Sequence, residues 1–294
     1  MGATMRPGLP ANIRGTGGAS VEEIIALRDE GLVEWAEIQL PRLLRPADGE
    51  LRGVVRDAAA RLALPVSLHS ETATFAATKD AGVRSVLAQT LSDTIDLGAD
   101  VGARVITVHP PLANPGGIDD MTGGRWAAEE EALLRDATDD QDEAEAWFVD
   151  MLGPIAERAE AAGIVLALEN MRAREGRARL NHAREIARFV RAIDLPAARI
   201  CLDVRKARRE GLDPAEFIRA CGRWIANVHV AGFTTIGKPA EVGEGDIDWS
   251  SVVAALQAAN YAGPLIYEGP PSTAGASLLA LRDAARARDT GHTV

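Results

Sequence analysis

Short apolar segments alternate with longer amphipathic segments along almost the whole chain. The clearest apolar segment, residues 164–169, follows Gly163, is too short for a helix and ends on the carboxylate of Glu169. Such a run is typical of a strand buried on both faces of a parallel sheet, whereas apolar residues spaced three or four apart predict helices. We predict strands at residues 5–13, 33–40, 65–69, 104–109, 164–169, 199–203, 224–230 and 264–268, and helices at 21–30, 50–64, 79–97, 141–162, 182–193, 213–221, 249–259 and 272–287.

Several predicted helices carry recognisable boundary residues. Ser20 and Glu23 have the spacing of a Ser-x-x-Glu capping box, and Gly31 stands where a glycine often follows a helix. Asp213 and Pro214 have the order of an N-cap residue followed by the first helical position. These signals predict where the corresponding helices begin and end.

The strict alternation of strands and helices predicts an α/β fold. The chain length of 294 residues suits a single (β/α)8 barrel, or TIM barrel, with residues 1–294 as one domain. A doubly wound open sheet is the competing fold, but it usually carries a Gly-x-Gly-x-x-Gly turn after its first strand. Gly15, Gly17 and Gly18 lack that spacing, so we predict the closed barrel.

Residues 110–140 depart from the alternation. They are rich in Pro, Gly and Asp, and a short acidic stretch around residues 127–135 predicts a helix within them. A loop of this length in a compact fold is usually a lid, a binding loop or a disordered segment, and the sequence leaves these alternatives open.

Composition narrows the class of protein. The apolar fraction of 47% and charged fraction of 26% are typical of a soluble globular protein. The net charge of −11 argues against a surface that grips nucleic acid or an anionic membrane. The two cysteines, Cys201 and Cys221, form no CxxC pair, and we find neither a signal-peptide core nor an apolar run long enough to cross a bilayer. We therefore expect a cytoplasmic protein.

Six consecutive predicted strands, the third to the eighth, end on or beside a residue of a metal-binding type. In a parallel barrel these ends meet at one mouth, where active sites lie. Taken singly, a strand-end histidine is more often structural, and a strand-end acid often caps the next helix. Three carboxylates close together repel one another without a cation, so the set as a whole predicts a divalent-metal site. The six residues are His69, His109, Glu169, Asp203, His229 and Glu268.

Longer motifs accompany these strand ends and carry a family resemblance. Over residues 33–270 the chain resembles the xylose-isomerase-like barrel superfamily, which holds sugar (phosphate) isomerases and epimerases, inosose dehydratases and zinc-dependent AP endonucleases. The motifs are Leu168-Glu169-Asn170, Leu202-Asp203, Asn227-Val228-His229, Gly243-Glu244-Gly245-Asp246-Ile247-Asp248-Trp249 and Gly263-Pro264-Leu265-Ile266-Tyr267-Glu268.

The resemblance implies a metal-dependent activity on a carbohydrate. In the epimerase branch the matching residues Glu169, Asp203, His229 and Glu268 bind one divalent cation (Mn²⁺, Mg²⁺, Co²⁺ or Zn²⁺), and the two glutamates double as acid and base. This implies an isomerase or epimerase of a sugar, sugar phosphate or sugar acid, which abstracts a proton α to a carbonyl through an enediolate. The alternatives are an inosose-dehydratase-like lyase, an AP-endonuclease-like phosphodiesterase and a non-catalytic metal- or ligand-binding barrel.

The chain departs from the epimerases where they hold substrate. They usually carry a histidine at the position of Lys206 and an arginine at that of Thr235. Lys206 retains the ability to donate to a substrate oxygen as a fixed cation, and Lys238 is a candidate to replace the missing arginine.

The resemblance to the endonucleases concerns two further histidines, His69 and His109. That branch uses residues like His69 and His109 for an additional zinc, so they are either second-metal ligands or, as we favour, part of the substrate pocket. Its third zinc needs a histidine at Lys206 and an Asp-x-His where this chain has Gly237-Lys238-Pro239. With the acidic net charge, this argues against a nucleic-acid substrate.

Basic residues cluster after the fifth and sixth predicted strands. They predict either a rim that attracts an anionic carbohydrate or a solvated rim paired with nearby acids. We expect a small-molecule carbohydrate as the partner, and the sequence leaves open whether the protein forms a homo-oligomer. The basic residues are Arg172, Arg174, Arg177, Arg179, Arg205, Lys206, Arg208 and Arg209.

Overall fold

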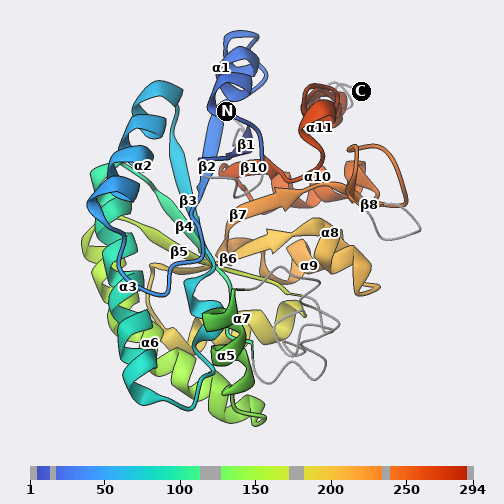
Figure 1. Ribbon diagram of the computed structural model, residues 1–294. Coiled ribbons are helices and arrows are strands. Elements are labelled where there is room, and N and C mark those ends of the chain that lie inside the picture. Colours follow the sequence, from blue (N-terminus) through green and yellow to red (C-terminus); the bar gives the residue numbers. More distant parts are fainter. Residues whose placement is uncertain (1–4, 14–17, 113–126, 172–181, 234–238, 290–294) are drawn as a thin grey trace.

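Eight strands form a closed parallel barrel at the centre of the molecule (Figure 1). A computed structural model describes residues 5–13, 18–112, 127–171, 182–233 and 239–289. Each strand pairs in parallel with its neighbours, and the first strand closes the barrel against the last. The strands are β1 Arg6–Ala11, β2 Trp35–Gln39, β3 Val66–Ser70, β4 Val105–Val108, β5 Val165–Glu169, β6 Ala198–Asp203, β7 Ile225–Val230 and β10 Pro264–Tyr267.

Helices surround the barrel, with α2, α3 and α6 along one side of it in Figure 1. Together with the closed parallel sheet they confirm the predicted (β/α)8 fold; that residues 1–294 make up one domain stays a prediction. Within the described ranges, none of the helices combines the length and apolar character that a bilayer crossing requires. The helices are α1 Val21–Asp29, α2 Gly49–Leu62, α3 Ala81–Asp100, α5 Ala128–Arg135, α6 Gln141–Ala161, α7 Ala183–Ile193, α8 Val204–Arg209, α9 Pro214–Cys221, α10 Trp249–Ala258 and α11 Ala274–Asp289.

Alternate residues of the strands face the helices and the barrel interior. Leu68 and Ile106, paired across β3 and β4, are fully buried and approach Gly98 of α3, where an added Cβ would lie 3.1 Å from Ile106 Cδ1. Their neighbour Thr107 instead donates to Glu37 of β2, a strand that is not adjacent to β4. The helix-facing positions therefore form the apolar core, and the interior-facing positions are free to carry polar chemistry.

The predicted helix boundaries are confirmed at atomic detail. The backbone N–H of Glu23 donates to Ser20 Oγ (3.2 Å), and Glu23 Oε2 accepts from the Ser20 backbone (2.7 Å). Gly31 has a φ of +71°, the left-handed conformation that favours glycine after a helix. Asp213 caps α9 by accepting from the backbone N–H of Ala215 at 2.8 Å.

Several short elements of the structure were not predicted, and two of them adjoin the strand-end residues. A 3-10 turn, η1 (Thr72–Phe75), follows β3, and the short helix α8 begins directly after Asp203 at the end of β6. Four of the six residues of α8 are basic, and its two apolar residues, Val204 and Ala207, are too few for their helical spacing to predict a helix. Further η turns lie at Gly222–Trp224 and Pro271–Thr273, and β8 (Gly232–Phe233) and β9 (Pro239–Ala240) form an antiparallel pair.

The acidic helix predicted within residues 110–140 is present as α5 and is held against the barrel. Leu134 packs in a small apolar cluster with Phe75, Leu87 and Leu112, and Arg42 Nε contacts Glu130 Oε1 at 2.9 Å. The preceding segment 113–126 lies outside the described residues, so whether it acts as a lid stays open.

Gly8 on β1 provides a test of the strand packing. A Cβ at this position would lie 2.8 Å from the Trp35 carbonyl oxygen and 2.7 Å from Ile266 Cδ1, on the two neighbouring strands. Gly8→Ala should therefore lower the free energy of unfolding by about 1–3 kcal/mol, measured by chemical denaturation. Gly53→Ala, on the exposed side of α2 with open space around it, should instead raise it by about 0.5–1 kcal/mol. Equal stabilities of the two variants would contradict this packing.

Candidate active site

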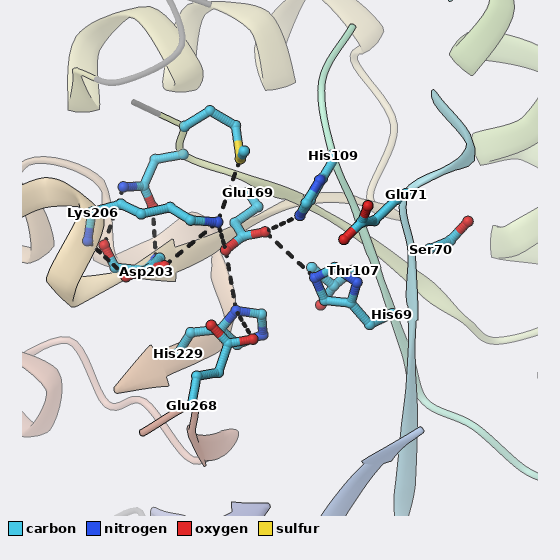
Figure 2. A network of polar contacts seen from close by, with 12 residues as sticks. His69, Ser70, Glu71, Thr107, His109, Glu169, Asp203, Lys206, His229 and Glu268 are labelled. Atoms are coloured by element: carbon cyan, nitrogen blue, oxygen red, sulfur yellow. Dashed lines mark hydrogen bonds and ion pairs between the residues drawn. The ribbon is translucent and has the colours of Figure 1, made fainter. Parts of the chain in front are cut away.

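The structure brings the six predicted strand-end residues together at one mouth of the barrel (Figure 2). Glu169 and Asp203 are the last residues of β5 and β6, whereas His69 and His229 stand one residue before the ends of β3 and β7. His109 and Glu268 follow β4 and β10 directly. Five of the six are buried, and the side chain of Glu268 is 16% exposed.

Glu169 lies at the centre of the group, with cationic or imidazole nitrogens around both of its oxygens. Its Oε1 accepts from Lys206 Nζ at 2.6 Å and lies 3.2 Å from His229 Nδ1. Its Oε2 lies 2.7 Å from His109 Nε2 and 3.5 Å from His69 Nε2. Figure 2 shows Glu169 between Lys206 on one side and the two histidines on the other.

Different surroundings shift the pKa values of the two predicted acid–base glutamates in opposite directions. Burial by itself would raise the pKa of Glu169, but the charges of Lys206, His109 and His229 outweigh it and hold that pKa well below its usual range. For Glu268, burial and the nearby carboxylates of Glu169 and Asp203 raise the pKa. One glutamate is therefore firmly ionised, while the other is protonated more readily.

Three of the four predicted metal ligands, Glu169, Asp203 and Glu268, form one group that could hold a cation, whereas His229 groups with Glu37, His69 and Glu268. Oxygens of Glu169, Asp203 and Glu268 all lie within 4.8 Å of one another, and His229 Nδ1 is 3.3 Å from Glu268 Oε1. Asp203 Oδ2 is buried and accepts no hydrogen bond within the described part of the chain. Three carboxylates and one imidazole are a donor set that suits a hard or borderline divalent cation, so the residues present fit such an ion.

Asn170 holds Asp203 in place. The Asn170 side chain accepts from the backbone N–H of Asp203 at 2.7 Å and donates to the Asp203 carbonyl at 3.1 Å. Asp203 Oδ1 caps α8 by accepting from the backbone N–H of Lys206 at 2.7 Å, which leaves Oδ2 toward the cluster. Asn170 was visible in the sequence only as the second residue of a Glu-Asn pair, and nothing there indicated this bridge.

Lys206 lies inside the cluster. Its Nζ is 2.6 Å from Glu169 Oε1 and 3.5 Å from Asp203 Oδ2, and its side chain is only 12% exposed. Burial would lower the pKa of Lys206, but the carboxylates of Glu169, Asp203 and Glu268 outweigh it and raise that pKa, so the ammonium is charged. From the sequence we expect the three carboxylates to lack a cation of the chain itself. That expectation is wrong, because Lys206 provides one.

Glu37 on β2 is a member of the site that the sequence did not reveal. Its Oε1 lies 3.0 Å from His229 Nε2, and its Oε2 accepts from Asn227 Nδ2 (2.8 Å), Ser67 Oγ (3.2 Å) and Thr107 Oγ1 (3.2 Å). It is fully buried within the strand rather than at its end, so the strand-end pattern does not include it. The available signal was a carboxylate inside a buried apolar strand, which requires a partner.

Both ring nitrogens of His229 therefore face carboxylates. Burial would lower the pKa of His229, but Cys201 and the carboxylates of Glu268, Glu37 and Glu169 outweigh it and raise the pKa well above its usual value. Because Nε2 contacts Glu37, Nδ1 points toward Glu169 and Glu268. A carboxylate behind a histidine in this manner is the usual way in which proteins orient a metal-binding imidazole.

His69 and His109 pack edge to face, with ring centroids 4.8 Å apart. Each also offers a nitrogen within 4.8 Å of an oxygen of Glu71, which follows β3. This arrangement suits either prediction made for the two histidines, as lining of a substrate pocket or as ligands of a second metal. Both roles stay predictions.

The basic rim predicted after β5 and β6 is described only in part. Arg205 lies 3.8 Å from Asp203 Oδ2, and Arg208 pairs with Asp246, so these two cations face acids of the chain itself. Arg172 and Arg174 lie outside the described residues, as does Lys238. An anion-attracting role of the rim therefore stays a prediction.

The fold and the site together define a TIM-barrel protein with a buried histidine–carboxylate cluster at its active-site mouth. Residues 31–288 match the model of the xylose isomerase-like TIM barrel family, and the chain belongs to that family. No sequence among the curated proteins matches it.

Solved structures with the same fold include several sugar epimerases. A D-tagatose 3-epimerase-like protein is 18% identical, with a TM-score of 0.73 over 98% of this chain and 100% of that one. L-Ribulose 3-epimerase is 20% identical, with a TM-score of 0.71 over 99% of each chain. The 3-keto-D-glucoside 4-epimerase of E. coli is 20% identical, with a TM-score of 0.70 over 95% of this chain and 99% of that one. At these identities the likeness establishes the fold.

The raised pKa of His229 predicts a pH dependence of stability. Because the folded pKa exceeds the unfolded value near 6.5, the stabilisation is full below pH 6.5 and is lost as the pH rises through the folded pKa. In EDTA-treated protein this one group should lower the free energy of unfolding by up to about 1.4 kcal/mol per pH unit in that window. His229→Gln should remove this component, whereas His182→Gln, at an exposed helix N-cap, should keep it. The same slope in His229→Gln as in the wild type would rule out the assignment.

Proposed function

We propose that this protein is a divalent-metal-dependent isomerase or epimerase of a sugar, sugar phosphate or sugar acid. The reaction begins with removal of a proton from the carbon next to a carbonyl group. One observation carries the proposal: the carboxylates of Glu169, Asp203 and Glu268 form one group that could hold a cation, and His229 Nδ1 lies 3.2 Å from Glu169 Oε1 and 3.3 Å from Glu268 Oε1. The sugar epimerases that share this fold support the choice of substrate class.

Glu169, Asp203, His229 and Glu268 are the residues that would hold the metal. When bound, such an ion supplies Lewis-acid stabilisation to the negative charge that develops on a carbonyl oxygen as the neighbouring carbon loses its proton. Asn170 and Glu37 would support this set indirectly, because they fix the orientations of Asp203 and His229.

The two glutamates reach the site from well-separated strands. Glu169 ends β5 and Glu268 follows β10, with β6 and β7 between them in the barrel. A substrate carbon between the two carboxyl groups can lose a proton to one and receive a proton from the other. This arrangement suits inversion at a carbon or movement of a carbonyl group along a sugar.

His69, His109 and Lys206 are the candidates for orienting the substrate. All three present nitrogens beside Glu169, the histidines on its Oε2 side and Lys206 on its Oε1 side. Nitrogen donors at these positions can hydrogen-bond to the hydroxyl and carbonyl oxygens of a sugar and hold the reacting carbon near the glutamate.

Proton exchange with solvent tests the proposal directly. The protein, loaded in turn with Mn²⁺, Mg²⁺, Co²⁺ or Zn²⁺, is incubated in D2O with a panel of ketoses, ketose phosphates, keto sugar acids and inososes. We expect deuterium at a carbon next to the carbonyl of at least one substrate, detected by NMR. Absence of exchange across the whole panel would reject the proposal. A product that has lost water would indicate a lyase, and three zinc ions per chain would favour the phosphodiesterase alternative.

Each glutamate should be essential to turnover. On a substrate identified by that panel, Glu169→Gln and Glu268→Gln should each lower kcat by about 10²- to 10⁴-fold, the range expected when a general acid or base is removed. Glu145→Gln is the matched control, because Glu145 is also buried but pairs with Arg188 on the outer helices. Full turnover by Glu268→Gln would exclude a mechanism with two bases.

Glu37 should act through metal affinity. Glu37→Gln keeps the shape of the side chain but removes the charge behind His229, and it should weaken Mn²⁺ binding by about 10- to 100-fold. Titration calorimetry on EDTA-treated protein measures the effect, with Glu145→Gln expected to match the wild type. Unchanged affinity in a folded Glu37→Gln protein would mean that Glu37 has no part in orienting the ligand.

A further inference from the structure

We infer that the ammonium of Lys206 is a built-in counter-ion of the carboxylate cluster, which competes with the divalent cation for the same oxygens and so sets how tightly the protein binds metal. This inference rests on the proposed function, because the metal belongs to that function. It concerns a residue that lies where the epimerase-like pattern has a different side chain.

The contacts of Lys206 are with the predicted metal ligands themselves. Its Nζ lies 2.6 Å from Glu169 Oε1 and 3.5 Å from Asp203 Oδ2. Asp203 Oδ2 accepts no hydrogen bond within the described ranges, and Arg205 Nη2 also lies 3.8 Å from it, so a metal ion at this oxygen would meet the charges of both Lys206 and Arg205. Figure 2 shows the Lys206 side chain running past Asp203 toward Glu169, with its Nζ in contact with both carboxylates.

The local fold directs the lysine side chain to this position. Helix α8 begins immediately after Asp203, whose Oδ1 caps it through the backbone N–H of Lys206 at 2.7 Å. Residues three positions apart lie on the same side of a helix, so the side chain of Lys206 rises beside the carboxylate of its own cap. Met171 Sδ, 3.5 Å from Nζ, lies beside the ammonium, and the side chain is only 12% exposed.

A metal ion and the ammonium cannot both keep these contacts. Both would draw on the carboxylates of Glu169 and Asp203, and two positive charges a few ångströms apart in a buried site repel strongly. Metal binding must therefore move Lys206 away from Glu169 or weaken its contact. The displaced ammonium remains near the site as a hydrogen-bond donor for a substrate oxygen. Lys206 therefore has a role in both the metal-free and the metal-bound protein.

Metal affinity with and without the lysine charge tests the inference. Mn²⁺ is titrated by calorimetry into EDTA-treated wild-type protein, Lys206→Met and Lys206→Gln. Arg208→Met is the matched control: it removes a cation two residues further along α8 that pairs with Asp246. Both Lys206 variants should bind Mn²⁺ at least about tenfold more tightly than the wild type, since one like charge at this range shifts ion binding by one or more powers of ten. Arg208→Met should remain within about twofold of it.

Thermal unfolding provides a second measurement, which does not depend on turnover. In EDTA, both Lys206 variants should unfold at a lower temperature than Arg208→Met, because the buried carboxylates of Glu169 and Asp203 lose their cation. Added Mn²⁺ should raise the unfolding temperature of the Lys206 variants by more than that of the wild type. Equal or weaker Mn²⁺ affinity in both Lys206 variants would overturn the inference.

The outcomes separate this inference from the proposed function. If the wild type binds Mn²⁺ but turns over no sugar, the function fails, while tighter binding by the Lys206 variants still supports the inference. If only the variants bind Mn²⁺, the inference is supported, with Lys206 as the permanent cation, and a metal-dependent function of the wild type is rejected. If none of the proteins binds Mn²⁺, both are rejected.

Discussion

The need to neutralise a fully buried carboxylate dominates this structure. Glu169 has no exposed surface, and an unpaired carboxylate in such a place would cost several kcal/mol. Lys206 and three histidines, from four different parts of the barrel rim, direct nitrogens at its two oxygens. These contacts cross-link the ends of β3, β4, β5 and β7 and the start of α8. The contacts that neutralise Glu169 therefore also fix the shape of the barrel mouth.

A second polar layer lies below this one, inside the barrel. Glu37 joins β2 to β7 through Asn227 and His229, and Ser67 and Thr107 add β3 and β4. Small apolar residues, Ala167 and Cys201, fill the interior beside it. Because the strands bring hydrogen-bonding groups to the centre from several directions, the interior can bury a charge without leaving it unsatisfied. Glu37 in this layer thereby fixes the orientation of the His229 ring from inside the barrel.

The barrel and most element boundaries could be predicted because their causes are local. The capping box at Ser20 and the run that ends on Glu169 each lie within a few residues. The convergence of strand ends also follows from topology, which is why the six donors were found together. Glu37 could not be found in this way, since its partner Asn227 is 190 residues away. Lys206 stands out in the sequence, but its contact with Glu169 depends on α8, a helix of six residues with a single apolar pair, which is too short to predict from periodicity.

The direct junction of β6 and α8 has a consequence for how this chain tolerates change. Asp203 both ends a strand and caps a helix, so its carboxylate cannot rotate without undoing the first turn of that helix. An α-helix advances by about 100° per residue. Insertion or deletion of a single residue between Asp203 and Lys206 would swing the ammonium to another side of the helix, away from Glu169. The loop lengths of a barrel usually vary freely, but at this junction the number of residues determines whether the Lys206 ammonium reaches Glu169.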